Sequence, residues 1–353
     1  MSVKDEPLTA CFPWFGGKRQ VAPIVWKRCG VVRNYVEPFF GGGAVMLGRP
    51  QPFEGTETIN DADGYVANFW RAVAADPEAV ANYADWPVTE NDLHARHIWL
   101  VERREEFTAR MDAEPDYFDV KVAGWWCWGL CCWIGSGWCS GDGPWRAVEN
   151  AEGVRQLVHL GNAGRGVNRQ LVHLGDAGQG VNRKLVHLGD AGREATPGKA
   201  STASESTSAT GILDWMERLA ARLARVRVCC GDWSRVCGPT VTVKQGLTAV
   251  LLDPPYAAEA ERTDRLYRCD SLTIANGVRE WCIANGDNPK MRIALCGYDG
   301  EHQMPDSWEC YAWKAKGGYA SQSEDHDNPN ARKERIWFSK FCIKPDGGQR
   351  ELF

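Results

Sequence analysis

The sequence lacks a long hydrophobic run. No stretch of its 353 residues reaches the roughly 18 to 20 consecutive apolar residues that a membrane-spanning helix requires. The first residues also lack the basic-then-apolar order of a signal peptide, because the acids Asp5 and Glu6 stand in that segment. With 44% hydrophobic and 25% charged residues, the composition is instead typical of a globular protein. We therefore expect no membrane segment and a cytoplasmic location.

An excess of basic residues is also missing. Lysine and arginine total 41 against 46 acidic residues, so the net charge is −5. A nucleic-acid partner would have to bind a local basic patch, because the overall field is weakly repulsive.

Cysteine is frequent, but the spacing typical of metal sites is absent. None of the 14 cysteines forms a Cys-x-x-Cys pair, and the single cluster lies between Cys127 and Cys139. A chain of this length does not need disulfides to stabilise its core. We expect buried, reduced thiols and no metal site.

The hydrophobic pattern predicts an α/β fold in two pieces. In the first piece, a strand candidate at 34–37 runs into glycines, and a second one at 58–60 leads to a helix. That helix has Val66, Phe69 and Val73 on one face and Asp61 or Asp63 as its N-cap. The second piece resumes at about residue 211 in the same style. Its expected helices span about 212–223 and 271–285, and its expected strands are 226–230, 249–252, 292–296 and 334–341. Strand, glycine turn and helix in succession indicate a doubly wound sheet.

The middle of the chain has a different composition. Six tryptophans fall between Trp125 and Trp145, and a repeat with a period of 14 follows, placing histidines at His159, His173 and His187. This period is too short for the common helical solenoids. A segment rich in serine, threonine and alanine then resembles a linker. We predict a domain with a first part at 1–85 and a second part at 212–353, interrupted by an inserted module at 86–211.

The sharpest chemical motif is Asp253-Pro254-Pro255-Tyr256, directly after an apolar strand. In an open α/β sheet, ligands bind beyond the carboxyl ends of the strands. Two prolines remove two backbone donors and leave carbonyls and a carboxylate as acceptors beside an aromatic ring. Such a binding site suits an exocyclic amine. Asp253 and the Pro254 carbonyl would accept the amine hydrogens, and Tyr256 would stack on the ring that bears the amine. A simple strand exit with two prolines is the structural alternative.

A second motif follows the first strand. Glu37-Pro38-Phe39-Phe40-Gly41-Gly42-Gly43 ends in glycines that allow a ligand to approach the backbone. The motif is neither a GxGxxG fingerprint nor a P-loop, which argues against dinucleotides and triphosphates. Some 20 residues further on, Asp61 ends the next strand, a position from which a carboxylate can bind ribose hydroxyls.

Together these residues resemble the Dam-type, or D12 class, adenine-specific DNA methyltransferases. Trp14-Phe15-Gly16-Gly17-Lys18 resembles the family's N-terminal element, 37–45 its cofactor loop, 60–63 its ribose-binding segment and 253–256 its catalytic DPPY motif. Gly231-Asp232-Trp233 is a weaker match to the pair beside the cofactor's adenine. The resemblance implies a Rossmann-like S-adenosylmethionine-dependent fold with an inserted target-recognition module, and a bacterial or phage origin. The implied cofactor-binding residues are Trp14, Gly17, Lys18, Glu37, Pro38, Phe39, Gly41, Gly43, Asp61, Asp232 and Trp233, and the implied catalytic residues are Asp253, Pro254, Pro255 and Tyr256.

The reaction implied by the resemblance is methyl transfer from S-adenosylmethionine to adenine N6 in double-stranded DNA. The base would be flipped out of the duplex to reach the binding site. Catalysis would rest on positioning and on acceptors suited to the charge of the transition state, with no covalent enzyme intermediate.

DNA contacts are expected from the repeat segment. Basic residues exceed acids by three between residues 146 and 199, and we expect phosphate or purine contacts from Arg155, Arg169, Arg183 and Lys184. The alternative is a solvated insertion that arose by repeat expansion and reads no sequence. A basic strip near the C-terminus, Lys316 and 332–335, has a solvated face as its simplest interpretation.

Three other functions remain open from the residues alone. The binding site for the amine also fits N4 of cytosine. An RNA or protein-glutamine methyltransferase more often has asparagine where Asp253 stands. A catalytically silent DNA-binding protein would keep the scaffold, although every cofactor motif is intact here. The recognition sequence, the oligomeric state and a restriction partner do not follow from the sequence.

Overall fold

A computed structural model describes residues 8–14, 17–50, 53–133, 138–139, 145–149, 155–159, 207–256, 272–314 and 333–344. In this part of the chain, a seven-stranded sheet has the order β5-β2-β1-β6-β7-β9-β8. The strands are β1 (Asn34–Glu37), β2 (Thr56–Asp61), β5 (Val226–Cys230), β6 (Thr248–Leu252), β7 (Met291–Tyr298), β8 (Glu309–Ala312) and β9 (Glu334–Phe338). The expected mixed α/β fold with a mostly parallel sheet is confirmed.

The order of the strands creates a switch point between β1 and β6. From β1 the chain moves outward through β2 to β5, and it then returns to the other side of β1 to build β6 and β7. These five strands are parallel, whereas β9 runs antiparallel to both β7 and β8. The carboxyl ends of β1 and β6 therefore lie side by side, where open α/β sheets bind their ligands.

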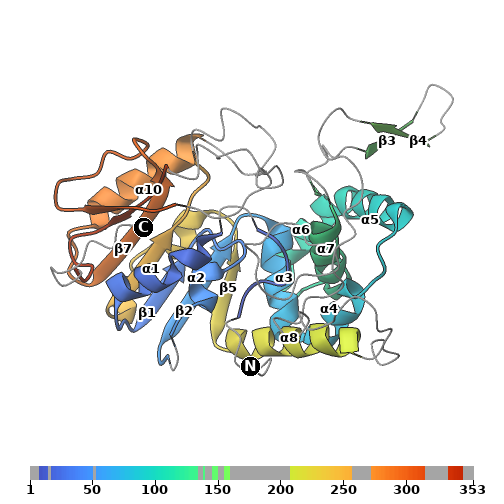
Figure 1. Ribbon diagram of the computed structural model, residues 1–353, viewed down its shortest axis with the longest axis horizontal. Coiled ribbons are helices and arrows are strands. Elements are labelled where there is room, and N and C mark those ends of the chain that lie inside the picture. Colours follow the sequence, from blue (N-terminus) through green and yellow to red (C-terminus); the bar gives the residue numbers. More distant parts are fainter. Residues whose placement is uncertain are drawn as a thin grey trace, which may run out of the picture.

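Alternation along the strands divides the core into two layers. Val36, Val250 and Leu295 face α10 (Leu272–Asn285), whose Val278 and Cys282 are buried against them. Tyr35, Leu251 and Cys296 point to the opposite face and join the larger core. That core includes α1 (Ala22–Cys29), α2 (Ala44–Leu47) and α3 (Gly64–Ala75). Both faces are covered, as a parallel sheet requires (Figure 1).

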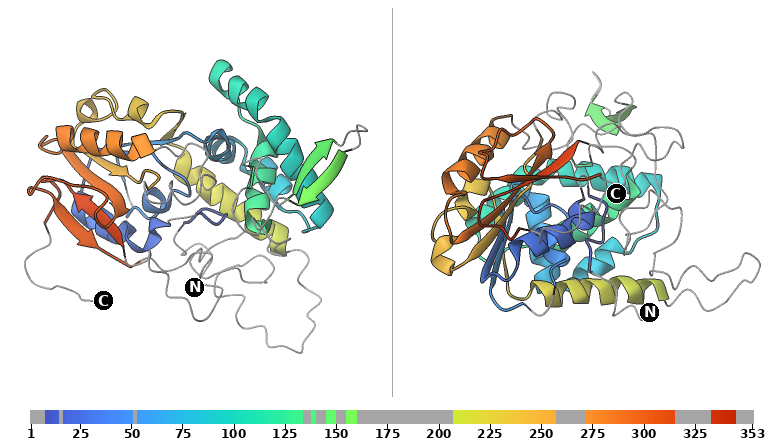
Figure 2. Two further views of the ribbon diagram at one scale, coloured as in Figure 1. Left: turned by 90° about the horizontal axis from the view of Figure 1, so that it is seen from above. Right: turned by 60° about the vertical axis from the view of Figure 1, so that its left-hand side comes forward.

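The helices beyond β2 form a layer beside the sheet (Figures 1 and 2). They are α4 (Pro77–Ala84), α5 (Glu90–Glu102), α6 (Arg104–Ala113), α7 (Val120–Cys132) and α8 (Thr207–Leu223). Both α7 and α8 pack against α3 and α4. Of the two N-cap candidates, Asp63 caps α3 by accepting a hydrogen bond from the Tyr65 amide at 2.8 Å.

Part of the tryptophan-rich segment belongs to the larger core. Trp126 on α7 is 2% exposed, and its ring lies 5.0 Å from that of Phe12. Trp128 is fully buried and donates to the Trp86 carbonyl. The extent of a separate module at 86–211 stays a prediction.

A short antiparallel pair lies apart from the main sheet and next to α5 (Figure 1). It consists of β3 (Trp145–Glu149) and β4 (Arg155–His159). The first of the 14-residue repeats thus contributes a strand. The other two repeats lie outside the described residues.

Candidate active site

Asp253 is the centre of a group of four polar side chains at the carboxyl end of β6. Its Oδ2 lies 3.0 Å from the Lys18 Nζ. Its Oδ1 accepts a hydrogen bond from the Tyr256 hydroxyl at 3.2 Å. The same hydroxyl lies 2.9 Å from Oε2 of Glu334, at the start of β9, and the Lys18 Nζ is 4.0 Å from that oxygen. Folding thus brings residues from both ends of the chain to one carboxylate.

Lys18 is a buried ammonium in this group, with a side chain that is 6% exposed. Burial favours the neutral amine, but Asp253 and Glu334 outweigh it and raise the lysine pKa above its ordinary value. The ammonium also lies 5.2 Å from the centre of the Tyr256 ring and 5.9 Å from that of Trp313. Lys18 is therefore charged and in contact with the DPPY motif at neutral pH.

Tyr256 is fixed at both ends of its side chain. Its ring meets that of Tyr298 edge to face, at 4.5 Å between centroids and 68° between planes. Burial, followed by the neighbouring carboxylates Asp253 and Glu334, raises the pKa of its hydroxyl far above the ordinary value. The hydroxyl therefore keeps its proton and acts as a donor.

The glycine-rich loop after β1 folds around Trp14. Gly41 and Gly43 have φ angles of 48° and 63°, which side chains other than glycine rarely adopt. A Cβ on Gly41 would collide with the Trp14 indole. The Gly41 carbonyl accepts a hydrogen bond from the Trp70 indole at 2.9 Å. The loop and the N-terminal element therefore form one surface, close to η2 (Lys18–Gln20), which Gly17 precedes.

Asp61 supports the same loop from the end of β2. Its Oδ2 accepts a hydrogen bond from the Gly41 amide at 2.9 Å, and its Oδ1 accepts one from the Asp63 amide at 2.9 Å. Burial outweighs these hydrogen bonds and raises the pKa of the carboxyl to about 7. Asp61 is therefore only partly ionised at neutral pH, and it remains half-buried rather than sealed from solvent.

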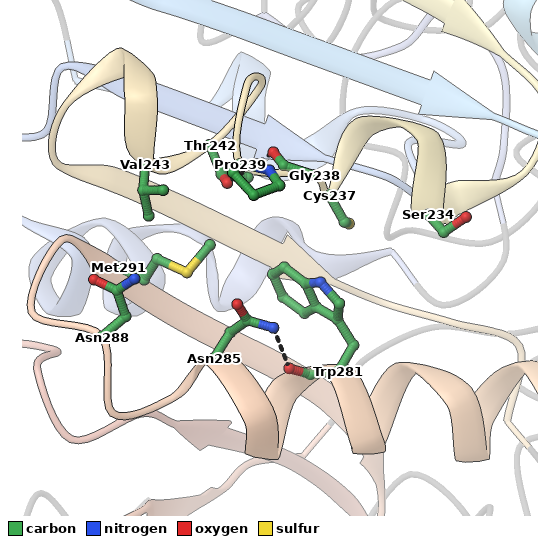
Figure 3. A pocket seen from close by; sticks show the side chains of 10 residues that line it. All are labelled: Ser234, Cys237, Gly238, Pro239, Thr242, Val243, Trp281, Asn285, Asn288 and Met291. Atoms are coloured by element: carbon green, nitrogen blue, oxygen red, sulfur yellow. Dashed lines mark hydrogen bonds between the residues drawn. The ribbon is translucent and has the colours of Figure 1, made fainter.

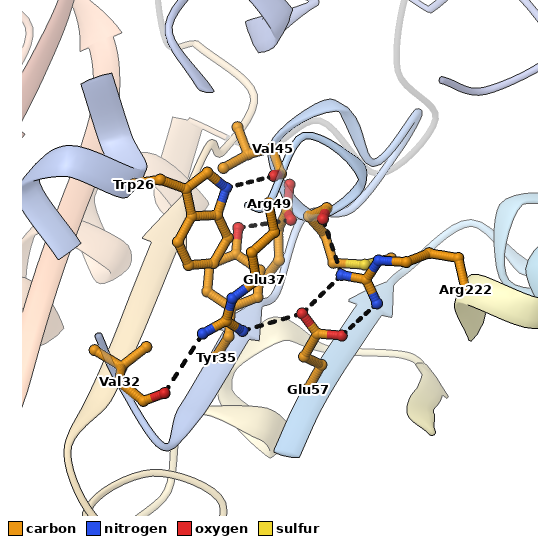
Figure 4. Close-up of polar contacts among 9 residues, drawn as sticks. Trp26, Val32, Tyr35, Glu37, Val45, Arg49, Glu57 and Arg222 are labelled. Carbon is orange, nitrogen blue, oxygen red and sulfur yellow. Dashed lines mark hydrogen bonds and ion pairs between the residues drawn. The ribbon is translucent and has the colours of Figure 1, made fainter. Parts of the chain in front are cut away.

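Glu37 lies beneath the loop in a buried polar network (Figure 4). Its Oε2 accepts a hydrogen bond from the Tyr35 hydroxyl at 2.8 Å. Burial is the main cause that raises the pKa of Glu37 to about 8. Beside it, Arg49 and Arg222 both bind the buried carboxylate of Glu57, with the nearest atoms at 3.1 Å and 2.6 Å.

A pair of aromatic rings lies beyond the glycine loop. Phe39 and Trp233 are nearly parallel, with 6.3 Å between centroids and 27° between planes. Asp232 accepts a hydrogen bond from the Ser234 amide at 3.0 Å and caps η4 (Trp233–Val236). The sequence-predicted residues around Asp61, Phe39 and Trp233 therefore come from three neighbouring strand ends, β2, β1 and β5.

A cavity of about 220 Å³ lies between the segment that follows η4 and the C-terminal end of α10 (Figure 3). It is lined by the segment from Ser234 to Val243 and by Trp281, Asn285, Asn288 and Met291. None of the four DPPY residues lines it. Asp253 instead lies at the carboxyl end of β6, beside Lys18.

The side chains predicted to contact DNA are not among those that the structure describes. Arg169, Arg183 and Lys184 lie outside the described residues, and Arg155 is described only as backbone in β4. Among the described residues, no three acidic, histidine or cysteine side chains are placed to hold a metal ion. No described helix is long and apolar enough to cross a membrane.

Two residues of the group around Asp253 were not predicted. Glu334 and Tyr298 face each other in the register of β9 and β7. An acid at the first position of an apolar strand was the available signal for Glu334. Tyr298 offered only its place at a strand end.

Residues 14–120 match the family of D12 class N6 adenine-specific DNA methyltransferases. Over this segment the chain is similar to the D12 class. The class transfers a methyl group to N6 of adenine in DNA, and methyltransferases of this kind generally take that group from S-adenosylmethionine. The expected enzyme class and reaction are confirmed. The match includes Trp14, Lys18, the glycine loop and Asp61, while DPPY lies beyond it. No curated protein matches the chain.

Proposed function

We propose that this protein is a D12 class enzyme that methylates N6 of an adenine flipped out of double-stranded DNA, with Asp253 to Tyr256 as its catalytic motif. The observation that carries the proposal is the position of Asp253 at the switch point, 3.0 Å from Lys18 of the N-terminal element. Two motifs separated by more than 200 residues are joined there into one site. Cellular DNA as the substrate would place the enzyme in the cytoplasm of a bacterial cell or phage-infected host.

The residues at the ends of β1, β2 and β5 fit S-adenosylmethionine. Phe39 and Trp233 offer aromatic faces to an adenine ring, and Asp61 offers a carboxylate to ribose hydroxyls. Asn60 adds a buried acceptor, because its Oδ1 has no hydrogen-bond partner in the described part of the chain while its amide group binds Pro38 and Gly231. A ligand rich in hydroxyl and amine hydrogens would satisfy such acceptors.

The remaining predicted cofactor residues surround this set. Trp14 and the backbone of Gly41 and Gly43 form the surface beside the ribose position. The cofactor-binding roles of Gly17, Lys18, Glu37, Pro38 and Asp232 remain part of the same proposal. When bound, S-adenosylmethionine supplies the methyl group of its sulfonium, whose electron pair stays with sulfur when the sulfur–carbon bond breaks.

Asp253 and Pro254 would activate the target amine. The lone pair of N6 is delocalised into the adenine ring, so hydrogen bonds that accept both amine hydrogens favour a tetrahedral nitrogen with its lone pair exposed. A carboxylate has about four lone-pair sites, so Asp253 can bind Lys18 and Tyr256 and still accept from the amine. The proton lost from N6 after methylation can leave through the Asp253 carboxylate, which is 23% exposed.

The base would have to leave the duplex to reach Asp253. The Tyr256 ring would replace part of the lost stacking. We assign DNA contacts to the module at 86–211, with Arg155, Arg169, Arg183 and Lys184 as phosphate or base contacts. Removing one phosphate-contacting arginine should weaken binding to all sequences and lower its salt dependence.

Analysis of modified nucleosides tests the proposal. The protein is expressed in a methylation-deficient host, and genomic DNA is digested to nucleosides and analysed by mass spectrometry. We expect N6-methyladenine, and single-molecule sequencing of the same DNA would give the recognition sequence. N4-methylcytosine without N6-methyladenine would overturn the proposed acceptor, while failure to bind S-adenosylhomocysteine at millimolar concentration would indicate a silent scaffold.

A further inference from the structure

Glu334 is a buried acid that lies in the candidate active site because its strand, β9, runs antiparallel to β7. The first residue of β9 therefore lies level with the carboxyl ends of the parallel strands. Glu334 is 5% exposed, and it stands opposite Tyr298, the last residue of β7. A buried carboxylate is costly unless it is paired, so its contacts reveal what it is placed to do.

Two side-chain contacts of Glu334 are with groups that also contact Asp253. The Tyr256 hydroxyl has one proton and two carboxylates within reach, at 2.9 Å for Glu334 and 3.2 Å for Asp253. Lys18 has its Nζ 3.0 Å from Asp253 and 4.0 Å from Glu334. Glu334 therefore takes the larger share of the tyrosine donor and a smaller share of the ammonium.

This sharing matters because the two donors compete with the target amine. Without Glu334, the hydroxyl proton would be directed at Asp253, and the ammonium would lose a second carboxylate oxygen at 4.0 Å. An acceptor that is already neutralised and hydrogen-bonded binds a further donor weakly. Glu334 adds a second carboxyl group that accepts from the same hydroxyl and lies 4.0 Å from the ammonium, so Asp253 keeps acceptor capacity for the amine.

We propose that Glu334 is a positioning residue for methyl transfer: it holds the Tyr256 hydroxyl and shares Lys18, and so leaves Asp253 free to accept the amine of the target base. The inference rests on the proposed function of Asp253. Glu334 itself does not touch the substrate. It acts through Tyr256, whose ring is held from the other side by Tyr298.

The test compares Glu334→Gln with wild type in single-turnover methylation of DNA from a methylation-deficient host. Glutamine keeps the shape and one acceptor oxygen but removes the charge that shares Lys18. We expect the methyl-transfer rate to fall about tenfold or more, with the affinity for S-adenosylmethionine unchanged, because the loss concerns the reacting amine. An unchanged rate would overturn the proposal, as would a loss confined to cofactor affinity.

Glu309→Gln is the matched control. Glu309 is on β8, opposite the far end of β9, and its carboxylate binds Arg28 at 2.7 Å. The same substitution there removes an ion pair on β8, the strand that pairs with β9, but leaves the active site intact. The methylation rate should therefore stay at the wild-type value. A comparable loss of rate in this variant would show that Glu334→Gln acts through the stability of the sheet.

Glu334→Asp decides the matter if the glutamine variant does not fold. Aspartate restores the charge but is shorter by one methylene, so it pulls back from the Tyr256 hydroxyl. We expect a rate between those of wild type and the glutamine variant, and a wild-type rate would overturn the role. A wild-type enzyme that makes no N6-methyladenine would instead refute the proposed function, so the two failures are distinguishable.

Discussion

Arg222 on α8 binds the carboxylate of Glu57 on β2 through two hydrogen bonds, at 2.6 Å and 2.8 Å. The residues are 165 positions apart, and they lie on either side of the segment with the repeats. Arg49 contacts the same carboxylate at 3.1 Å, so one buried acid is paired with two guanidinium groups (Figure 4). This contact joins α8 to the sheet.

Replacement of Glu57 should strongly destabilise the fold. Glu57→Gln leaves Arg49 and Arg222 charged and buried without a counter-charge, and removing one partner of a buried ion pair typically costs about 3 to 5 kcal/mol. Urea unfolding followed by circular dichroism measures the loss. Glu309→Gln, whose carboxylate is 44% exposed, should cost about 1 kcal/mol or less. Equal losses in the two variants would contradict the importance of burial.

Replacement of Asp253 should separate catalysis from cofactor binding. Asp253→Ala removes the acceptor for the target amine, and we expect methylation to fall by at least about 100-fold. Cofactor binding, measured by titration calorimetry with S-adenosylhomocysteine, should change little.

Asp299→Ala serves as the control for that substitution. Its carboxylate is 61% exposed and pairs with Arg335 at 2.9 Å. Its activity should stay within a few-fold of wild type. Retained activity in Asp253→Ala would refute the assigned role.

Cofactor affinity should depend on pH through Asp61. The pKa of its carboxyl is raised to about 7 by burial, so the acceptor form is lost as pH falls through that value. We expect S-adenosylhomocysteine to bind more weakly at pH 6 than at pH 8. Asp61→Asn should bind weakly at both pH values and show a smaller pH dependence.

The raised pKa of Asp61 also makes the free energy of unfolding depend on pH. The folded pKa of Asp61 lies above the ordinary value of 3.8, so the folded state binds the proton more tightly than the unfolded state. The contribution of this group to stability is therefore fully present at low pH and is lost as pH rises toward 7. Glu37 adds a similar loss at slightly higher pH, so Glu37→Gln is needed as the comparison. Unfolding of wild type and Asp61→Asn at pH 5 and pH 8 measures the difference, and a gap that does not change with pH would contradict the raised pKa.

Gly41 should not tolerate a side chain. Gly41→Ala adds a Cβ that collides with Trp14 at a φ of 48°, where non-glycine residues cost roughly 1 to 2 kcal/mol before any collision. We expect lower thermal stability and weaker S-adenosylhomocysteine binding. Gly238→Ala is the control, because a Cβ there has no heavy atom within 4 Å. Equal behaviour of the two variants would show that the packing of Trp14 on the loop is unimportant.

Local patterns in the sequence determined most of the sheet and the two ligand loops. The strands β1, β5 and β6 agree with the predicted ranges to within a residue, because each is a short apolar run that ends in glycine, proline or an acid. β8 was missed, since an exposed edge strand with alternating burial carries little hydrophobic signal. The similarity to the D12 class, found over residues 14–120, was also predictable, because each motif in that segment is contiguous in the sequence.

Only the tertiary structure decided which residues meet Asp253. Glu334 and Tyr256 are 78 positions apart, and their contact depends on the antiparallel direction of β9 next to β7. The pairing of Glu57 with Arg222 likewise depends on which face of β2 packs against α8. Local sequence determines the backbone of each element, because short-range sterics and periodicity act within it. The identity of a partner on another element is set by strand order and direction, which those short-range forces do not specify.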